Sequence, residues 1–208
     1  INIGAVYTLG RTLHGDAYKY HQTGAESNGS IYVQSQTGDT IPNPFKMPHT
    51  FGIGLTYVYD NRLTIGVDYT LQKWNTADLA WSKFNKESVE MNSRTKIAFG
   101  AEFVPSYISH NYLKRIRYRM GAYCSSPYNK VSYTSPDTGT TSFQDGAREY
   151  GVSIGFGLPM FQSKSMLNIS GQYIKVSPKF KGLMEENYLR INIGLTFNER
   201  WFMKWKVD

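Results

Sequence analysis

Residues 51–74 have the sequence FGIGLTYVYDNRLTIGVDYTLQKW and contain two runs in which apolar side chains alternate with small or polar ones. In the first run, apolar residues such as Phe51 and Ile53 alternate with glycine and threonine. Successive side chains of a β-strand point to opposite faces, so each run predicts a strand with one apolar face. Asp60-Asn61 separates the runs, and both residue types tolerate the left-handed conformation of a tight turn. The stretch therefore predicts a β-hairpin.

The same alternation recurs along the chain and predicts eight strands. The connections between the strands alternate between long and short, and an antiparallel series brings all the long ones to the same end. Bacterial outer-membrane barrels sort their connections in this way, with the long ones outside and the short ones in the periplasm. The predicted strands cover residues 1–9, 51–59, 63–72, 94–104, 114–124, 150–158, 167–173 and 189–197, with long connections at 10–47, 75–92, 125–146 and 177–187 and short ones at 60–61, 105–113 and 159–164.

The alternation alone does not say which face is buried, because a soluble barrel turns its apolar face inward and a membrane barrel turns it towards lipid. Arg115, Arg117 and Arg119 share one predicted face, which points to water in the first case and to the lumen in the second. The opposite face is nearly free of charge in every strand and rich in Tyr and Phe, which is typical of a lipid-facing band. We therefore predict an all-β fold, a transmembrane antiparallel β-barrel with about eight strands in this chain.

The composition agrees with this class. Only 40% of the 208 residues are hydrophobic, and no run approaches the length of a membrane-spanning helix. The net charge is +7, but we find no basic helix or nucleic-acid motif, so outer-membrane lipid and lipopolysaccharide are the expected partners and nucleic acid is not. The single cysteine, Cys124, forbids an internal disulfide. The chain begins at Ile1 within a strand pattern, so we expect a fragment or a processed product.

The strand patterns include Pro48 before a strand, Lys73-Trp74 at a strand end, Arg94 with Ile97-Ala98-Phe99-Gly100, Ile193-Gly194-Leu195-Thr196-Phe197, and the ending 197–202. These features resemble the C-terminal part of the FadL/OmpP1/TodX family of outer-membrane transporters, in a Bacteroidetes-type form. The resemblance implies the last eight strands of a 14-stranded barrel and the uptake of hydrophobic compounds such as long-chain fatty acids. The N-terminal hatch and first strands of such transporters would be missing here.

The predicted lumen carries a set of charged side chains that are the candidate ligand-binding residues. Hairpin pairing about residues 105–113 would bring Glu102 close to Arg115 or Arg117. These charges either fill and brace the barrel or meet a carboxylate head group in transit, and the first alternative is favoured. The candidates are Arg115, Arg117, Arg119, Glu102, Asp68, Lys96 and Arg190.

A second candidate is a hydrophobic patch in the first loop after the hairpin, formed by Trp74, Leu79, Trp81 and Phe84. It would bind lipid-like substrate or hold the loop at the barrel rim. The domain prediction is a barrel over 1–197 and a periplasmic aromatic and basic tail over 198–208, which would anchor the base of the barrel or dock a partner.

The sequence shows no catalytic motif, no metal-ligand spacing and no cofactor site, so we predict that the protein is not an enzyme. The expected function is uptake of hydrophobic compounds across the bacterial outer membrane. The alternative is a structural or assembly barrel that acts through other outer-membrane proteins. A third and weaker alternative is a lipid-modifying enzyme at the rim that uses His14 or His21.

Overall fold

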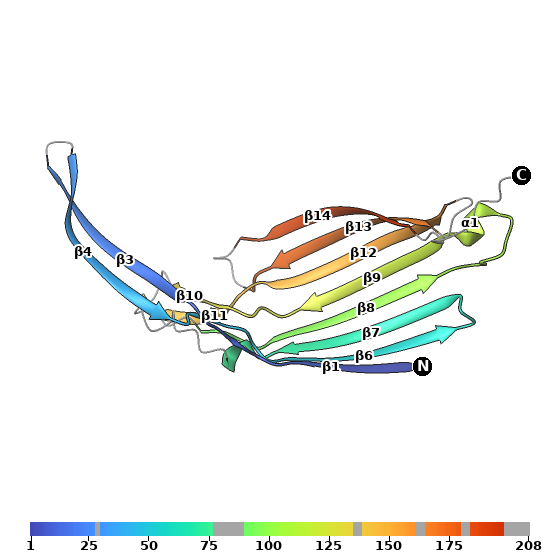
Figure 1. The fold of residues 1–208 in the computed structure, drawn as a ribbon, viewed down its shortest axis with the longest axis horizontal. Coiled ribbons are helices and arrows are strands. Elements are labelled where there is room, and N and C mark those ends of the chain that lie inside the picture. The colour runs from blue at the N-terminus through green and yellow to red at the C-terminus, as the bar shows by residue number, and fades with distance from the viewer. Residues whose placement is uncertain (28–29, 77–89, 135–138, 161–164, 180–183, 198–208) are drawn as a thin grey trace, which may run out of the picture.

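The computed structural model describes residues 1–27, 30–76, 90–134, 139–160, 165–179 and 184–197, and its main feature is one eight-stranded sheet (Figure 1). Every strand in this sheet pairs antiparallel with its neighbours, and the strands follow one another in chain order. The predicted all-β class and the antiparallel series are confirmed. The order is β1 (Asn2–Thr8), β6 (Thr50–Tyr59), β7 (Leu63–Gln72), β8 (Arg94–Phe103), β9 (Arg117–Ser125), β12 (Arg148–Pro159), β13 (Met166–Ser177) and β14 (Glu186–Thr196).

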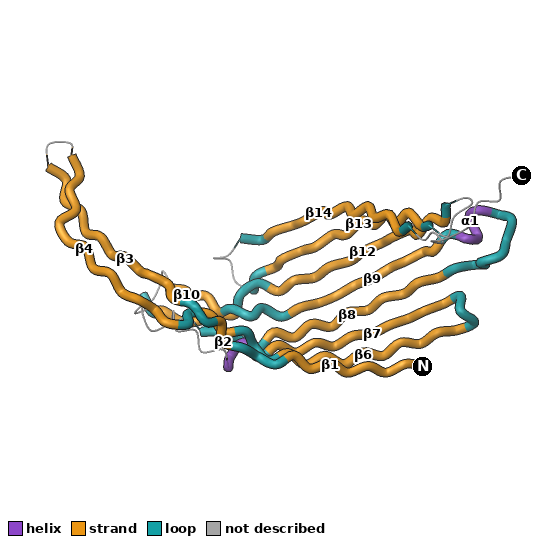
Figure 2. Tube along the Cα trace, viewed as in Figure 1, coloured by secondary structure: helices purple, strands orange, loops and turns teal. Residues whose placement is uncertain are grey.

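Three two-stranded ribbons lie in the long connections at one end of the sheet, the loop end (Figures 1 and 2). The longest is the β3–β4 ribbon, which projects away from the sheet (Figure 1). The ribbons pair β2 (Thr12–Leu13) with β5 (Phe45–Lys46), β3 (Asp16–Ser27) with β4 (Ser30–Pro42), and β10 (Lys130–Thr134) with β11 (Thr141–Asp145).

The β6–β7 hairpin has the predicted turn. Asp60 and Asn61 have φ values of 47° and 48°, in the left-handed region that these residue types tolerate. The Arg62 N–H donates to the Tyr59 carbonyl at 3.0 Å and closes the turn. The strands then pair without interruption, which keeps one face apolar along the whole hairpin.

The connection between β8 and β9 differs from the prediction because it contains a single helical turn, α1 (Tyr112–Arg115). The Asn111 side chain caps this turn by accepting the Leu113 N–H at 3.0 Å. The strand predicted at 114–124 therefore begins only at Arg117. The cap at Asn111 thus favours a helical turn where the alternating pattern predicted the start of a strand.

The long connection at 10–47 also differs from the prediction. It was predicted only as a long connection, but within the described residues it contains β3 and β4, which pair with each other in a sheet of their own. The connection at 125–146 contains the β10–β11 hairpin, which was not predicted. The tail predicted at 198–208 lies outside the described residues.

The two faces of the large sheet differ in chemistry. The apolar face carries rows of Ile, Leu, Val, Phe and Tyr that stay exposed: Ile154 is 57% exposed and Ile193 is 73% exposed. The opposite, polar face carries Gly, Ser and Thr with the charged side chains. Buried apolar side chains are few among the described residues, and they are Ile41, Val104, Ile116 and Ile174.

The sheet is open in the part of the chain that the structure describes. There β1 pairs only with β6, and β14 pairs only with β13. No helix among the described residues is both long enough and apolar enough to cross a membrane.

Candidate functional site

On the polar face of the sheet, one carboxylate forms ion pairs with two arginines. This cluster lies near the end of the sheet that carries the short connections. Glu102 of β8 lies opposite Arg119 of β9 and accepts the Arg119 Nε–H at 2.7 Å. The other carboxylate oxygen of Glu102 accepts an N–H of Arg117 at 3.2 Å. Arg119 also donates to the Asn168 side-chain oxygen at 2.8 Å. Two guanidinium groups share one carboxylate, so this cluster carries a net positive charge, and it links β8, β9 and, across the intervening β12, β13.

Of the two partners predicted for Glu102, Arg117 is confirmed and Arg115 is not part of the cluster. Arg115 lies in α1, where its guanidinium carbon is 5.6 Å from the centre of the Tyr112 ring. The helical turn removes Arg115 from the row of side chains that includes Arg117 and Arg119. The partner of Glu102 is thus Arg119 together with Arg117.

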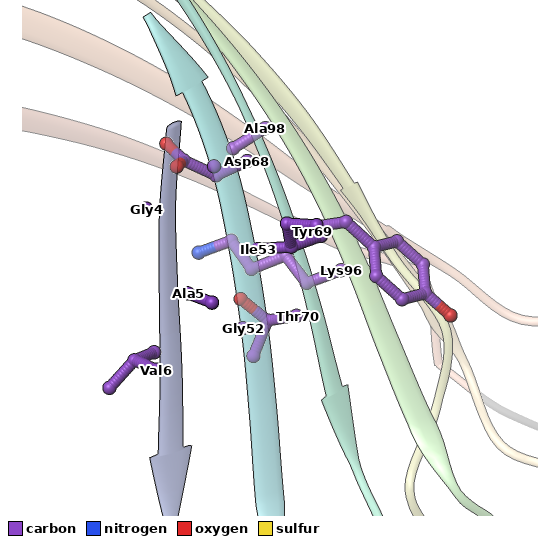
Figure 3. Close-up of a pocket in the computed structure, with 11 residues that line it drawn as sticks. Gly4, Ala5, Val6, Gly52, Ile53, Asp68, Tyr69, Thr70, Lys96 and Ala98 are labelled. Atoms are coloured by element: carbon purple, nitrogen blue, oxygen red, sulfur yellow. The ribbon is translucent and has the colours of Figure 1, made fainter. Parts of the chain in front are cut away.

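Asp68 and Lys96 line an open pocket of about 530 Å³ near the β1 edge (Figure 3). Both project from the polar face, whereas the Tyr69 ring points to the other side of the sheet (Figure 3). The Lys96 ammonium lies 4.4 Å from the centre of the Tyr123 ring, a cation–π contact. A side chain at Gly54 would collide with the Asp68 carboxylate, so this glycine gives the carboxylate its space.

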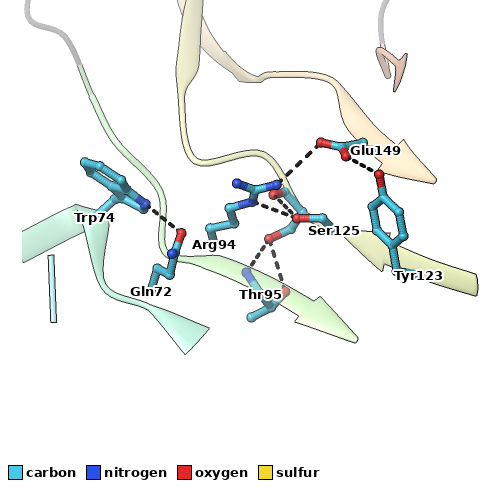
Figure 4. A network of polar contacts seen from close by, with 8 residues as sticks. Gln72, Trp74, Arg94, Thr95, Tyr123, Ser125 and Glu149 are labelled. Atoms are coloured by element: carbon cyan, nitrogen blue, oxygen red, sulfur yellow. Dashed lines mark hydrogen bonds and ion pairs between the residues drawn. The ribbon is translucent and has the colours of Figure 1, made fainter. Parts of the chain in front are cut away.

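A second polar network lies on the same face towards the loop end (Figure 4). Arg94 donates to the buried Ser125 hydroxyl at 2.7 Å and to Glu149 at 3.4 Å. The Tyr123 hydroxyl donates to the other Glu149 oxygen at 2.5 Å. These contacts join β8, β9 and β12 and exclude Glu149 from a role as a free anionic site. The candidate Arg190 lies on β14 opposite Gln172, on the same face.

The loop end is held together by contacts between different connections. Asn92 donates to Asp145 at 2.6 Å, and Lys179 lies 3.4 Å from the same carboxylate. The Asn92 hydrogen bond and the Lys179 charge hold the pKa of Asp145 below its ordinary value, against a smaller opposing effect of burial. Lys130 forms a further ion pair with Glu90 at 2.6 Å.

Of the predicted loop patch, only Trp74 is described. Its indole N–H donates to the Gln72 side chain at 3.1 Å (Figure 4), and its ring lies 5.5 Å from the Tyr128 ring. Trp74 therefore holds two connections together at the rim of the sheet. Leu79, Trp81 and Phe84 lie outside the described residues.

The β3–β4 ribbon is the surface that sequence reasoning missed. Tyr18 and Tyr20 stand on one face of β3 and are 67% and 64% exposed. Tyr20 lies over Gly38 of β4, where an added side chain would press on the ring. The alternation of Tyr18 and Tyr20 with Lys19 and His21 was the available signal. A two-stranded ribbon is only marginally stable in water on its own, so an exposed aromatic face on it points to a contact surface.

The histidines show no catalytic grouping within the described residues. His14 Nδ1 lies 3.3 Å from the Asn43 side-chain oxygen, and His21 pairs with Thr37 in the ribbon register. No group of three His, Cys, Asp or Glu side chains in the described ranges lies close enough together to hold a metal ion.

An antiparallel sheet with an exposed apolar face, a charged opposite face and all its long connections at one end is typical of bacterial outer-membrane proteins. A family model described as BamG matches residues 1–208, and the chain belongs to the BamG family. This family is related to the BAM complex and is associated with the outer membrane. No protein of curated function and no solved structure matches the sequence.

The family corrects the resemblance on which the transport expectation rested. The chain is not a member of the FadL-type transporter family. The 14-stranded transporter barrel and its hatch were implied only by that resemblance, so nothing now supports them. The misleading features were period-two strand patterns, and membrane physics imposes the same patterns on unrelated outer-membrane sheets.

Proposed function

We propose that the protein is an accessory component of outer-membrane protein assembly that acts through protein partners. The observation that carries this proposal is the BamG family match over residues 1–208. The partners are other outer-membrane proteins, components of the BAM complex among them. The charged polar face, with its shared carboxylate, serves to brace the sheet.

The eight-stranded sheet is the membrane anchor in this proposal. A soluble protein rarely leaves so many neighbouring apolar side chains exposed, and lipid would cover them. Strands of 10 residues, such as β6, β7 and β8, extend about 33 Å and span the apolar band when tilted. In lipid every backbone polar group needs a partner, so β1 and β14 pair with each other or with further strands to close a barrel. The two edge strands run antiparallel, so an even number of added strands, including none, would close it.

The β3–β4 ribbon is the docking element for a partner at the outer surface. It carries the exposed Tyr18 and Tyr20 beyond the rim of the sheet, where a protein can contact both sides of the ribbon. Exposed tyrosines give large contact areas at low conformational cost.

The ribbon can be tested by excision, because its base is held separately. The Asn43 N–H donates to the Gly15 carbonyl at 2.8 Å, and Ala17 pairs with the buried Ile41. Replacing residues 18–40 by Asn-Gly keeps this base and supplies a two-residue hairpin turn. The tagged full-length protein and the excised variant would be purified from solubilised outer membranes, and BAM-complex proteins would be quantified by mass spectrometry.

We expect BAM-complex proteins to co-purify with the parent protein and to be depleted from the excised variant, with both found in the outer-membrane fraction. The matched control replaces residues 132–143 of the β10–β11 hairpin by Asn-Gly and should retain the partners. Absence of BAM-complex proteins from the parent sample would overturn the proposed function. Equal recovery with the excised variant would overturn the role of the ribbon alone.

We also propose that this role is not catalytic. The contacts of His14 and the ribbon position of His21 support this, because neither histidine meets a nucleophile or an acid that would complete a catalytic set in the described residues. The variants His14→Ala and His21→Ala should therefore assemble outer-membrane proteins at the parental rate in cells. A loss of that activity with unchanged protein level would support the enzyme alternative.

A further inference from the structure

The apolar face of the sheet changes character at the loop end of β1, β6 and β7. Tyr7 and Phe51 face each other in the last aromatic row, with ring centres 4.9 Å apart. One step further towards the loops stand His49 and Lys73, and the Lys73 N–H donates to the His49 carbonyl at 2.9 Å. Because side chains alternate, His49 and Lys73 share the face of Phe51. The lipid-facing surface of the proposed anchor therefore ends in a basic and aromatic margin.

Lys46 joins this margin from β5. Lys46, His49, Phe51 and Lys73 line one cavity of about 400 Å³. The Lys73 ammonium lies 5.6 Å from the centre of the Phe51 ring, directly at the boundary between apolar and polar surface. Among the described residues, no carboxylate lies within ion-pair distance of either lysine. The cavity thus combines two cations with an apolar wall.

The His49 ring is fixed by its surroundings. Its Nδ1 accepts the Gly10 backbone N–H at 3.2 Å and lies 2.7 Å from the Tyr7 hydroxyl. A backbone N–H can only donate, so Nδ1 is the acceptor and the neutral ring carries its proton on Nε2. The Tyr7 ring is stacked with the His49 ring at 6.0 Å. His49 therefore carries a hydrogen-bond donor at Nε2, and its ring, held in place by Tyr7 of β1, lines the cavity together with Lys46 and Lys73.

We propose that this cavity binds the phosphate group of a phosphorylated outer-leaflet lipid. The phosphate lies between Lys46 and Lys73 and accepts a hydrogen bond from His49, and the acyl chains run along Phe51 and Ile53 of the apolar face. Charge complementarity and the continuity of the cavity with the apolar face select a lipid phosphate over a free one. The inference rests on the membrane anchor of the proposed function and is independent of the ribbon and its partners.

The test uses the full-length protein in lipid nanodiscs made of a zwitterionic phospholipid with a minor fraction of lipid A. Native mass spectrometry of the released protein would count the lipid A molecules that stay bound. The arms are phosphorylated lipid A, the same lipid A after enzymatic removal of its phosphates, and inorganic phosphate added alone. We expect retention of the phosphorylated lipid by the parent protein and loss of that retention for the dephosphorylated one.

The variants are Lys46→Gln, Lys73→Gln and the double change. Each lysine near an anionic lipid surface contributes about fivefold to binding, so the double variant should bind roughly 25-fold more weakly. The matched control is Lys175→Gln, which removes a lysine from the same face near the same end of the sheet. Lys175 is already paired with Glu185 at 2.5 Å, so its loss should leave retention unchanged.

The proposal would be overturned if the double variant retained phosphorylated lipid A as well as the parent protein does. It would also be overturned if the parent protein retained dephosphorylated lipid A equally well. Displacement of the lipid by inorganic phosphate alone would also overturn it, because it would indicate a general anion site. Co-purification of BAM-complex proteins is a separate readout. A negative lipid result with intact partner recovery therefore leaves the proposed function standing.

Discussion

Glu102 lies opposite Arg119 across β8 and β9, and its two carboxylate oxygens are divided between Arg119 and Arg117 at 2.7 Å and 3.2 Å. Each of the three side chains is about one-third exposed, so the cluster is partly solvated. Removing the carboxylate would leave two guanidinium groups side by side without their shared counter-ion.

The first prediction follows from this cluster. Glu102→Gln should lower the free energy of unfolding by about 1–2 kcal/mol, a figure already reduced for solvent screening. Chemical denaturation of the protein in detergent micelles would measure it. Arg62→Gln is the control, because its ion pair with Asp60 is exposed and should contribute little. Equal stability of Glu102→Gln and the parent would contradict a bracing role.

The second prediction concerns the direction of the apolar face. Ile191 and Asn192 are neighbours on β14 but point to opposite faces of the sheet. Ile191→Arg should cost about 2–4 kcal/mol in a bilayer if its face meets lipid, while Asn192→Arg should cost less than about 1 kcal/mol. Unfolding in lipid vesicles measures both variants. Similar values for the two would argue against the membrane anchor.

The third prediction concerns Gly151 of β12. A Cβ atom at this position would lie 2.1 Å from the Tyr123 ring, which would have to move away from Glu149. Gly151→Ala should therefore destabilise the protein by about 1–3 kcal/mol through overpacking. Gly171 on the adjacent strand has open space around it, so Gly171→Ala is the matched control and should be nearly neutral. Differential scanning fluorimetry in detergent would rank the variants.

The fourth prediction is a pH effect at the loop end. The pKa of Asp145 is lowered from 3.8, mainly by the Asn92 hydrogen bond and with help from Lys179. The folded form thus favours the ionised carboxylate, and its contribution is fully present above pH 3.8 and is lost as the pH falls through the lower folded pKa.

Hydrogen exchange of β10 and β11 amides, corrected for intrinsic rates, should show loosening of this hairpin below pH 3.8. Asp145→Asn should remove the pH dependence of that protection. The effect is small because the carboxylate is largely solvated. A parental hairpin whose protection does not change with pH would show that the ion pair does not hold it.

Strand periodicity and turn chemistry were predictable because both are local. The alternation around Phe51 and the left-handed turn at Asp60-Asn61 depend on neighbours a few residues apart, and β6, β7 and β8 formed close to the predicted bounds. The sorting of long connections followed from the antiparallel order. The family could not be predicted in this way, because alternating strands reflect the membrane environment and occur in unrelated outer-membrane proteins.

The sequence by itself determined eight strands with one apolar and one charged face, since a period of two residues needs no knowledge of the rest of the chain. Tertiary structure decided which charges meet. Of the two partners predicted for Glu102, Arg117 pairs with it and Arg115 does not, because Arg115 lies in the helical turn α1; Arg119 is the additional partner. Tertiary structure also placed Lys46 and Lys73 in the lining of one cavity. The two lysines come from separate elements, and no local sequence pattern encodes their proximity. Contacts between distant segments depend on strand register and loop closure, and those are settled only when the whole sheet forms.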